Sequence, residues 1–218
     1  MEEYKHCIVV AVTGGMGCGQ TTVASFFKKF GAYVVNADEM AKKAIDRNDE
    51  LRKKLKQTFG SRIFHRNGKL NRKKLASMVF QDESKLTKLN KLVHPHMVEN
   101  IIEEIEKARE SGKYKIIMVD AALIYEINIE NMFDAVIVVA SYMKNRIERI
   151  MKRDGHSRKH ILDRISKQIP IEDKMKWADY IIENNKDLKA LEEKSRIVWD
   201  ELLKLVEKKK TEKPRLEL

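Results

Sequence analysis

The stretch GGMGCGQTT at residues 14–22 has the residue types and the spacing to bind a nucleoside triphosphate. It follows the phosphate-loop pattern G-x-x-x-x-G-K-[ST] at Gly14, Gly19 and Thr21, but Gln20 stands where the pattern has lysine. The glycines leave little side chain to block a phosphate, so backbone amides and a helix N-terminus can cradle the anion. A tight strand-to-helix turn without a ligand is the alternative. The candidate nucleotide-binding residues are Gly14, Gly15, Gly17, Cys18, Gly19, Gln20, Thr21 and Thr22.

Gln20 should reduce phosphoryl transfer more than nucleotide binding. A lysine at this position places a positive charge against the β- and γ-phosphates, whereas glutamine donates only a neutral hydrogen bond. A hydrogen bond to a charged group contributes about 1.5–3 kcal/mol, against about 1 kcal/mol for a neutral one. We therefore expect binding to weaken modestly and the transfer rate to fall by about 10²–10³, by analogy with a lost oxyanion donor.

Two aspartates follow apolar runs that read as strands. Asp38 follows the run VVNA, and Asp120 ends the run IIMVD. Open α/β sheets bind their ligands at the carboxyl ends of parallel strands. Asp38 can accept a proton from an attacking hydroxyl, or it can cap the next helix. Asp120 has the position of a magnesium-side carboxylate, so we expect Mg²⁺ to be held by Asp120 and the Thr21 hydroxyl.

A basic segment lies near the C-terminal third of the chain. Arg146, Arg149 and Arg153 recur at helical spacing in NRIERIMKRDG, and Arg158 and Arg164 follow. This pattern favours a lid at about 153–170 that closes positive charge over a triphosphate and excludes water. For every single arginine except Arg153, a solvated basic helix face is the stronger interpretation.

The order of the elements indicates an α/β fold with a five-stranded parallel sheet and helices on both faces. Apolar runs separated by amphipathic helical stretches are typical of such a sheet. The second and third runs are about 75 residues apart, so we predict a helical insertion at about 39–110, in which Pro95 ends one helix. The sequence thus predicts one domain over 1–207, with a last helix at about 187–208 and a charged tail at 208–218. The predicted strands are 7–12, 32–37, 114–120, 134–140 and 179–184.

Composition limits the classes of partner and compartment. The 218 residues are 43% hydrophobic and 35% charged, and 44 basic against 33 acidic residues give a net charge of +11. That charge attracts polyanions, but without a nucleic-acid motif we consider nucleic acid an unlikely ligand. No apolar run approaches the roughly 20 residues of a membrane span. Cys7 and Cys18 suggest no disulfide framework, and with no evident secretory signal we expect a cytoplasmic protein.

The order of these motifs resembles the dephospho-CoA kinase family from residue 7 to about 205. The resemblance runs through TGGMGCGQTTVA, VVNADEMAKKAI, LNKLVHPHM, VDAALIYE, RIMKRDG, RISKQ and ADYIIENN. It implies transfer of the γ-phosphoryl of ATP, with magnesium, to the ribose 3′-hydroxyl of dephospho-CoA, the last step of CoA synthesis.

The resemblance also assigns roles to individual residues. It makes Asp38 the base, makes Arg153 the lid arginine that faces the phosphates, and gives the helical insertion to the CoA side. It places Arg149 and Asn184 at the nucleotide, with Asn184 near the adenine, and it makes His94 structural. Residues of the substrate stretch are Leu123, Tyr125 and Glu126, and Lys174 and Asp179 also match the family.

Three positions depart from the family pattern. Gln20 replaces the loop lysine, Asn36 replaces the first aspartate of an Asp-Ala-Asp turn, and Ala122 stands where the family usually has proline. One hypothesis is therefore an active kinase in which a nearby lysine or a lid arginine supplies the missing charge. The alternative is a catalytically silent relative that binds nucleotide or CoA for regulation, and a basic nucleic-acid binder is the third.

Overall fold

The computed structural model describes residues 7–79, 82–155 and 157–211. The chain divides into two compact units. One unit, here called the sheet unit, combines Met1–Val35 with Ile105–Leu218, and the other, the helical unit, is Asn36–Glu104. No helix among the described residues is long and apolar enough to span a bilayer.

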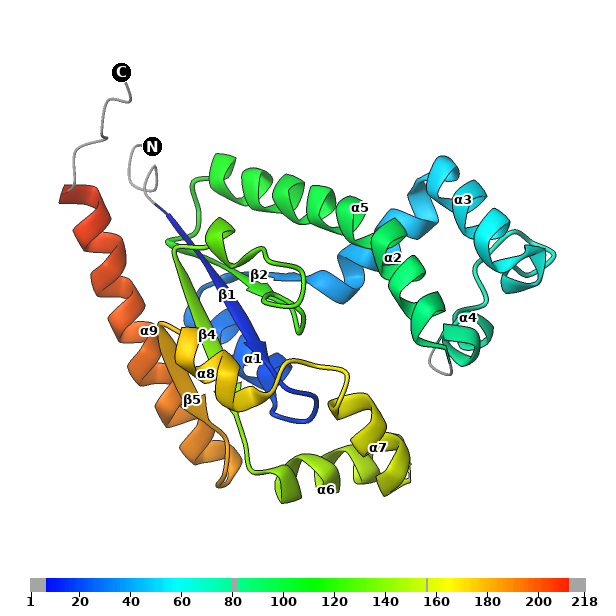
Figure 1. Cartoon of the computed structure of the whole chain (residues 1–218). Helices are drawn as coiled ribbons and strands as arrows, with labels where there is room; N and C mark the ends of the chain where they lie inside the picture. Colours follow the sequence, from blue (N-terminus) through cyan, green and yellow to red (C-terminus); the bar gives the residue numbers. More distant parts are fainter. Residues whose placement is uncertain (1–6, 80–81, 156, 212–218) are drawn as a thin grey trace. The chain divides into compact units, whose positions relative to one another are not determined.

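The five predicted strands form one sheet in the order β2-β3-β1-β4-β5 (Figure 1). The β1–β3, β1–β4 and β4–β5 pairs are parallel. Every residue of β1, β3 and β4 is buried, which explains why these runs are apolar on both faces. The prediction of a five-stranded parallel α/β sheet is confirmed. The strands are β1 Ile8–Gly14, β2 Tyr33–Asn36, β3 Ile116–Asp120, β4 Ala135–Ala140 and β5 Tyr180–Glu183.

An aspartate immediately before each of β4 and β5 ties that strand to its neighbour. The Asp134 carboxylate accepts a hydrogen bond of 2.7 Å from the Val9 amide, and the Asp179 carboxylate accepts one of 2.8 Å from the Val136 amide. The backbone amide of each aspartate also donates to the carbonyl of that same partner residue. Asp179, which matches the family pattern in the sequence, therefore has a structural role.

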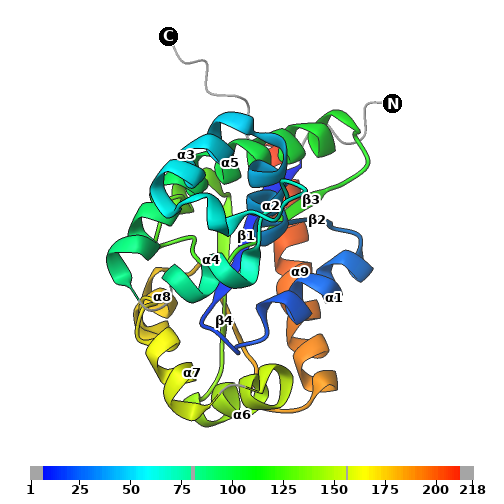
Figure 2. The same ribbon diagram turned by 90° about the vertical axis from the view of Figure 1, so that its right-hand side faces the viewer.

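Helices flank the sheet on both sides. In Figure 2, α1 and α9 lie on one side of the strands and α8 on the other. The α1–α9 contact is aromatic, because the Trp199 ring meets those of Phe27 and Phe30 edge-on, each with a centroid distance of 5.9 Å. The helices of this unit are α1 Gln20–Phe30, α6 Met143–Asp154, α7 Arg158–Ile165, α8 Ile171–Trp177 and α9 Leu188–Thr211.

The last helix is longer than the sequence predicts. We expected the charged tail to begin at 208, but α9 continues to Thr211. Lys209 pairs with Asp134 and Lys210 with Glu207, and basic side chains in a last helical turn interact favourably with the helix dipole. The rest of the predicted tail, 212–218, lies outside the described residues.

The helical unit contains α2 Ala37–Arg47, α3 Asp49–Phe59, a short 3-10 turn Ser61–Ile63, α4 Arg72–Val79 and the first part of α5. The sequence reads as one helical segment over 38–59, but Asn48 divides it. The Asn48 side chain accepts a hydrogen bond of 2.8 Å from the Leu51 amide and so caps α3. An apolar cluster that includes Leu51, Leu55 and Ile63 lies in the core of the unit.

The prediction that Pro95 ends a helix is wrong, because α5 runs unbroken over Glu83–Glu110. Proline in a helix interior removes one hydrogen bond and costs about 3 kcal/mol. Val93 and Met97 lie on either side of the proline at helical spacing, and both are buried. Their packing continues one apolar face across the proline and offsets that cost.

Candidate functional site

The phosphate loop, residues 14–22, joins β1 directly to α1. Gly19 caps α1 in a left-handed conformation, with φ 95° and ψ 24°, and no side chain caps the helix. In the described part of the chain the amides of Gly19, Gln20 and Thr21 have no hydrogen-bond acceptor. Unpaired amides at a helix N-terminus bind anions, because they point outward and the helix dipole adds positive potential.

Side chains from distant parts of the chain, two of them buried, hold this loop. The Asn184 amide, 7% exposed, donates to the Cys18 carbonyl at 2.8 Å. The Gln168 side chain accepts from the Met16 amide at 2.9 Å, and Arg146 Nε donates to the Met16 carbonyl at 2.9 Å. The loop shape is therefore fixed by directional bonds before any ligand arrives.

Arg149 also supports the loop. Its guanidinium donates to the Ser141 hydroxyl at 3.2 Å and to the carbonyl and side-chain oxygens of Asn184 at 2.9 and 3.1 Å. A longer contact of 3.5 Å reaches the Gly17 carbonyl. Both residues that the resemblance placed at the nucleotide, Arg149 and Asn184, thus contact each other and the loop.

Cys18 contributes backbone atoms, and not its thiol, to the site. Its side chain is fully buried, and burial raises the pKa of the thiol although the nearby Arg146 charge opposes this. The thiol therefore stays protonated at neutral pH and packs as an apolar group.

Gln20 and Asp120 lie in direct contact. The Gln20 Nε2 atom donates to Asp120 Oδ1 at 2.8 Å, and Asp120 is 4% exposed. The register that pairs Val12 with Asp120 explains this closeness, because β1 and β3 end side by side. Thr21 follows in the first turn of α1 and is exposed. A hydroxyl and one carboxylate suit Mg²⁺, which prefers oxygen ligands and takes most of its shell from phosphates and water.

Asp38 belongs to the helical unit and lies in the first turn of α2, where it is exposed. The alternative that Asp38 caps this helix is wrong. Asn36 is the cap, and its side chain accepts a hydrogen bond of 3.0 Å from the Glu39 amide. The Asn36 departure from the family pattern therefore keeps a side-chain acceptor at the cap position.

A buried ion pair lies beneath the stretch that contains Leu123, Tyr125 and Glu126. Lys174 is fully buried, and its Nζ atom lies 2.7 Å from Glu126 Oε1 and donates to the Ala122 carbonyl at 3.0 Å. Ala122 is thus held by a strong donor despite lacking the ring of a proline. Glu126 Oε2 is buried and has no hydrogen-bond partner among the described residues, so it keeps an unused acceptor there.

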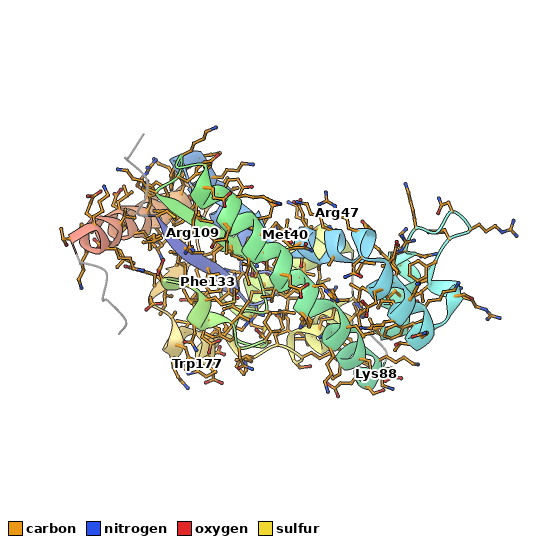
Figure 3. The ribbon with its side chains drawn as sticks, turned by 90° about the horizontal axis from the view of Figure 1, so that it is seen from above. Met40, Arg47, Lys88, Arg109, Phe133 and Trp177 are labelled. Carbon is orange, nitrogen blue, oxygen red and sulfur yellow. The ribbon has the colours of Figure 1, made fainter. Side chains whose placement is uncertain are left out.

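Tyr125 lies beside this pair. Its ring packs edge-on against that of Trp177, with a centroid distance of 5.3 Å. Trp177 is the last residue of α8 (Figure 3). Burial is the main reason that the pKa of Tyr125 rises to about 12. Its hydroxyl is buried and, like Glu126 Oε2, has no partner in the described part of the chain. Leu123 is half-buried in the same stretch.

The arginines of α6 are arranged differently from the sequence expectation. Arg153 is exposed and forms two hydrogen bonds with Asp154, at 2.7 and 2.8 Å, which raise its pKa. Arg146 is only 3% exposed, so the solvated-face interpretation is wrong for this residue. Helical spacing cannot show which face of α6 points to the loop, and sequence reasoning missed Arg146 as a loop contact for that reason. It also missed Gln168, which lies in a turn after α7, outside any helical or strand pattern.

Comparison with known proteins gives one consistent family. A family model described as dephospho-CoA kinase matches residues 8–190. Dephospho-CoA kinase of Bacillus licheniformis is 36% identical over 185 residues, which is 85% of this chain and 92% of that protein. The Bacillus cereus enzyme is 34% identical over 178 residues, or 82% and 88% of the two chains.

Solved structures agree. The Thermus thermophilus protein TT1252 has a TM-score of 0.75 at 30% identity, and the dephospho-CoA kinase from Campylobacter jejuni has one of 0.62 at 27%. Each similarity covers 90% of this chain and 98% of the other. With a family match over most of its length and relatives above 30% identity, the chain belongs to the dephospho-CoA kinase family.

Proposed function

We propose that this protein transfers the γ-phosphoryl group of ATP to the ribose 3′-hydroxyl of dephospho-CoA, with CoA and ADP as products. Family membership supports the reaction. The observation that supports ATP as the phosphoryl donor is the phosphate loop, whose amides at the start of α1 have no acceptor among the described residues. Dephospho-CoA as acceptor rests on the relatives, whose names state that activity.

The loop residues bind the triphosphate in this proposal. The amides at the start of α1 face phosphate oxygens, and Arg149 and Asn184 keep the loop in shape. Thr21 and Asp120 hold Mg²⁺, which neutralises charge between the β- and γ-phosphates when bound. The loop residues with this role are Gly14, Gly15, Gly17, Cys18, Gly19, Gln20, Thr21 and Thr22.

The acceptor side uses the helical unit and the segment after β3. Asp38 accepts the proton of the 3′-hydroxyl as its oxygen bonds to phosphorus, and its exposed carboxylate is not used as a helix cap. Leu123, Tyr125 and Glu126, in the segment after β3, contact the substrate in this proposal. Arg153 exchanges its Asp154 partner for phosphate oxygens when the lid closes.

A hollow in the helical unit fits the CoA side. Its volume is about 590 Å³, and its lining includes Arg52, Lys53, Lys56, His65 and Arg66 against one acidic residue, Asp49. Such a basic lining attracts a phosphorylated ligand. We place the reaction in the cytoplasm, where thiols stay reduced, because Cys7 and Cys18 are free.

The direct test is ATP-dependent CoA formation from dephospho-CoA by purified protein, with and without Mg²⁺. Turnover by the natural chain, and its loss in Asp38→Asn, is the expected result. Asp46→Asn, an exposed carboxylate of the same helix, serves as the matched control. Binding of ATP and dephospho-CoA without any product, even at high enzyme concentration, would overturn the proposal in favour of a catalytically silent relative.

A further inference from the structure

Gln20 leaves the phosphate loop with a neutral side chain where a cation is expected, while Arg146 lies directly beneath the same loop. Besides the Nε bond to Met16, Arg146 approaches Gly15 closely. A Cβ atom on Gly15 would lie 2.5 Å from Arg146 Nη2 and 2.9 Å from its Cζ. Because Gly15 has no side chain, the guanidinium reaches the loop backbone.

The charge on Arg146 has no counter-charge within the part of the chain that the structure describes. Among the described residues no carboxylate pairs with Arg146, and neither Nη1 nor Nη2 has an acceptor. Burying a guanidinium without an anion is unfavourable, so this arrangement favours a ligand that brings negative charge.

The unused nitrogens of Arg146 are also accessible. The buried side-chain polar atoms without a partner in the described chain are Tyr125 OH, Glu126 Oε2 and Glu130 Oε2. The Nη atoms of Arg146 have no partner either and are not among these atoms, so they still touch solvent. A ligand on the loop can therefore reach them.

Arg149, Arg153 and Lys174, three other cations of the sheet unit, already have partners. Arg149 donates to Ser141 and Asn184, Arg153 pairs with Asp154, and Lys174 pairs with Glu126. Using any of these for phosphate would break existing bonds. Arg146 would lose nothing, since only its Nε is occupied.

We propose that Arg146 supplies the positive charge that Gln20 lacks, by binding the β- and γ-phosphates of ATP on the loop through Nη1 and Nη2. The guanidinium fork suits this task, because it makes paired charge-assisted hydrogen bonds to phosphate oxygens. Gln20 in turn holds Asp120 through its neutral amide. This inference rests on the proposed function for the identity of the nucleotide.

The first experiment compares Arg146→Gln with Arg146→Lys in the CoA-forming assay. Both variants lose the Nε bond to Met16, but only the lysine keeps a charge. We expect kcat to fall by about 10²–10³ in Arg146→Gln and by about tenfold or less in Arg146→Lys. Lys144→Gln, an exposed cation of the same helix, is the matched control and should keep full activity. Equal losses in the two Arg146 variants would overturn the inference.

Rescue by a lysine in the loop separates charge from structure. Gln20→Lys in the Arg146→Gln background should restore kcat to within about tenfold of Gln20→Lys alone, because a lysine at 20 supplies charge to the same phosphates. A lysine there cannot rebuild the bond to the Met16 carbonyl. Failure of the rescue therefore identifies Arg146 as a structural support only and overturns the inference.

Nucleotide binding tests the inference without turnover. In Arg146→Gln the affinity for ATP should fall about 10- to 100-fold while that for AMP, which lacks the β- and γ-phosphates, stays the same. Parallel losses for the two nucleotides would overturn the inference. If no variant forms CoA, the proposed function fails, and this difference still decides the role of Arg146.

Two further outcomes are decisive. Suppose that the natural chain forms no CoA and that Gln20→Lys does. Arg146 then does not replace the lysine and the inference fails, but the site is still able to catalyse the family reaction once the lysine is present. If circular dichroism shows Arg146→Gln to be unfolded, Gly15→Ala takes its place, because its methyl group displaces the guanidinium. Unchanged ATP affinity in Gly15→Ala would then overturn the inference, and a loss confined to ATP would support it.

Discussion

The phosphate loop of the sheet unit and the core of the helical unit are each stabilised by a different kind of interaction. Around the phosphate loop, polar side chains such as the buried Asn184 and the half-buried Arg149 bond to backbone atoms from distant parts of the chain. In the helical unit a continuous apolar cluster around Leu51 and Leu55 forms the core, and its ion pairs, such as Lys54–Glu50, lie at the surface.

This difference teaches what each unit is built to do. Hydrogen bonds depend on direction, so a polar network fixes the positions of individual atoms, as a phosphate cradle requires. Apolar packing depends on volume and tolerates changes of shape. The loop therefore depends on particular side-chain atoms, whereas the helical unit depends on filled space.

Removing the buried lysine of the sheet unit should have the largest effect. Lys174→Ala leaves Glu126 with an uncompensated charge, and we expect the free energy of unfolding to fall by about 3–5 kcal/mol. Urea denaturation measures this change. Lys176→Ala removes an exposed ion pair with Asp173 on the same helix and should leave the urea midpoint unchanged. A similar small effect for both variants would show that the buried pair adds little to the sheet unit.

A cavity introduced into the helical unit by substitution should have the second-largest effect on stability. Leu55→Ala should cost about 2–5 kcal/mol, because Leu55 is fully buried in the apolar cluster. Hydrogen exchange should rise within 36–104, and ATP affinity should stay the same. Gln57→Ala, exposed on the same helix, provides the control. A loss of ATP affinity in Leu55→Ala would contradict this comparison, because it would mean that the phosphate loop also depends on the apolar core of the helical unit.

Releasing the loop should affect binding more than stability. Asn184→Ala removes the donor to the Cys18 carbonyl and one acceptor of Arg149, so we expect ATP affinity to fall about 10- to 100-fold. Titration calorimetry gives the change, and the exposed neighbour Lys186→Ala is the reference. Unaltered affinity would mean that the loop keeps its shape without this side chain.

The smallest effect is a pH dependence in the helical unit. Burial lowers the pKa of His94, so the unfolded chain binds a proton at higher pH than the folded one. This histidine therefore contributes stability above its ordinary pKa of about 6.5, and that contribution is lost as the pH falls below it. Urea midpoints at pH 8 and pH 5 should differ less in His94→Gln than in the natural chain. The exposed His65→Gln should leave the difference as it is.

Sequence patterns predicted the strands because a buried parallel strand must be apolar on both faces. They predicted the phosphate loop because four glycines fall within six residues between a strand and a helix. They also contained the break at Asn48, a favoured capping residue, although the apolar periodicity obscured it. Arg146 could not be predicted. Its burial depends on how α6 meets a loop 130 residues earlier in the chain, which no local pattern encodes. The unbroken α5 depends likewise on packing that outweighs the local effect of Pro95.

Gly15 differs from its loop neighbours in the reason for being glycine. Gly17 and Gly19 have positive φ angles of 81° and 95°, whereas Gly15 is not among the glycines with positive φ. Its lack of a side chain serves the approach of Arg146 instead. In an evolving lineage these two positions should change as a pair, since a shorter residue at 146 makes room for alanine at 15. An aligned set of relatives would then show covariation between two sites that lie far apart in the chain.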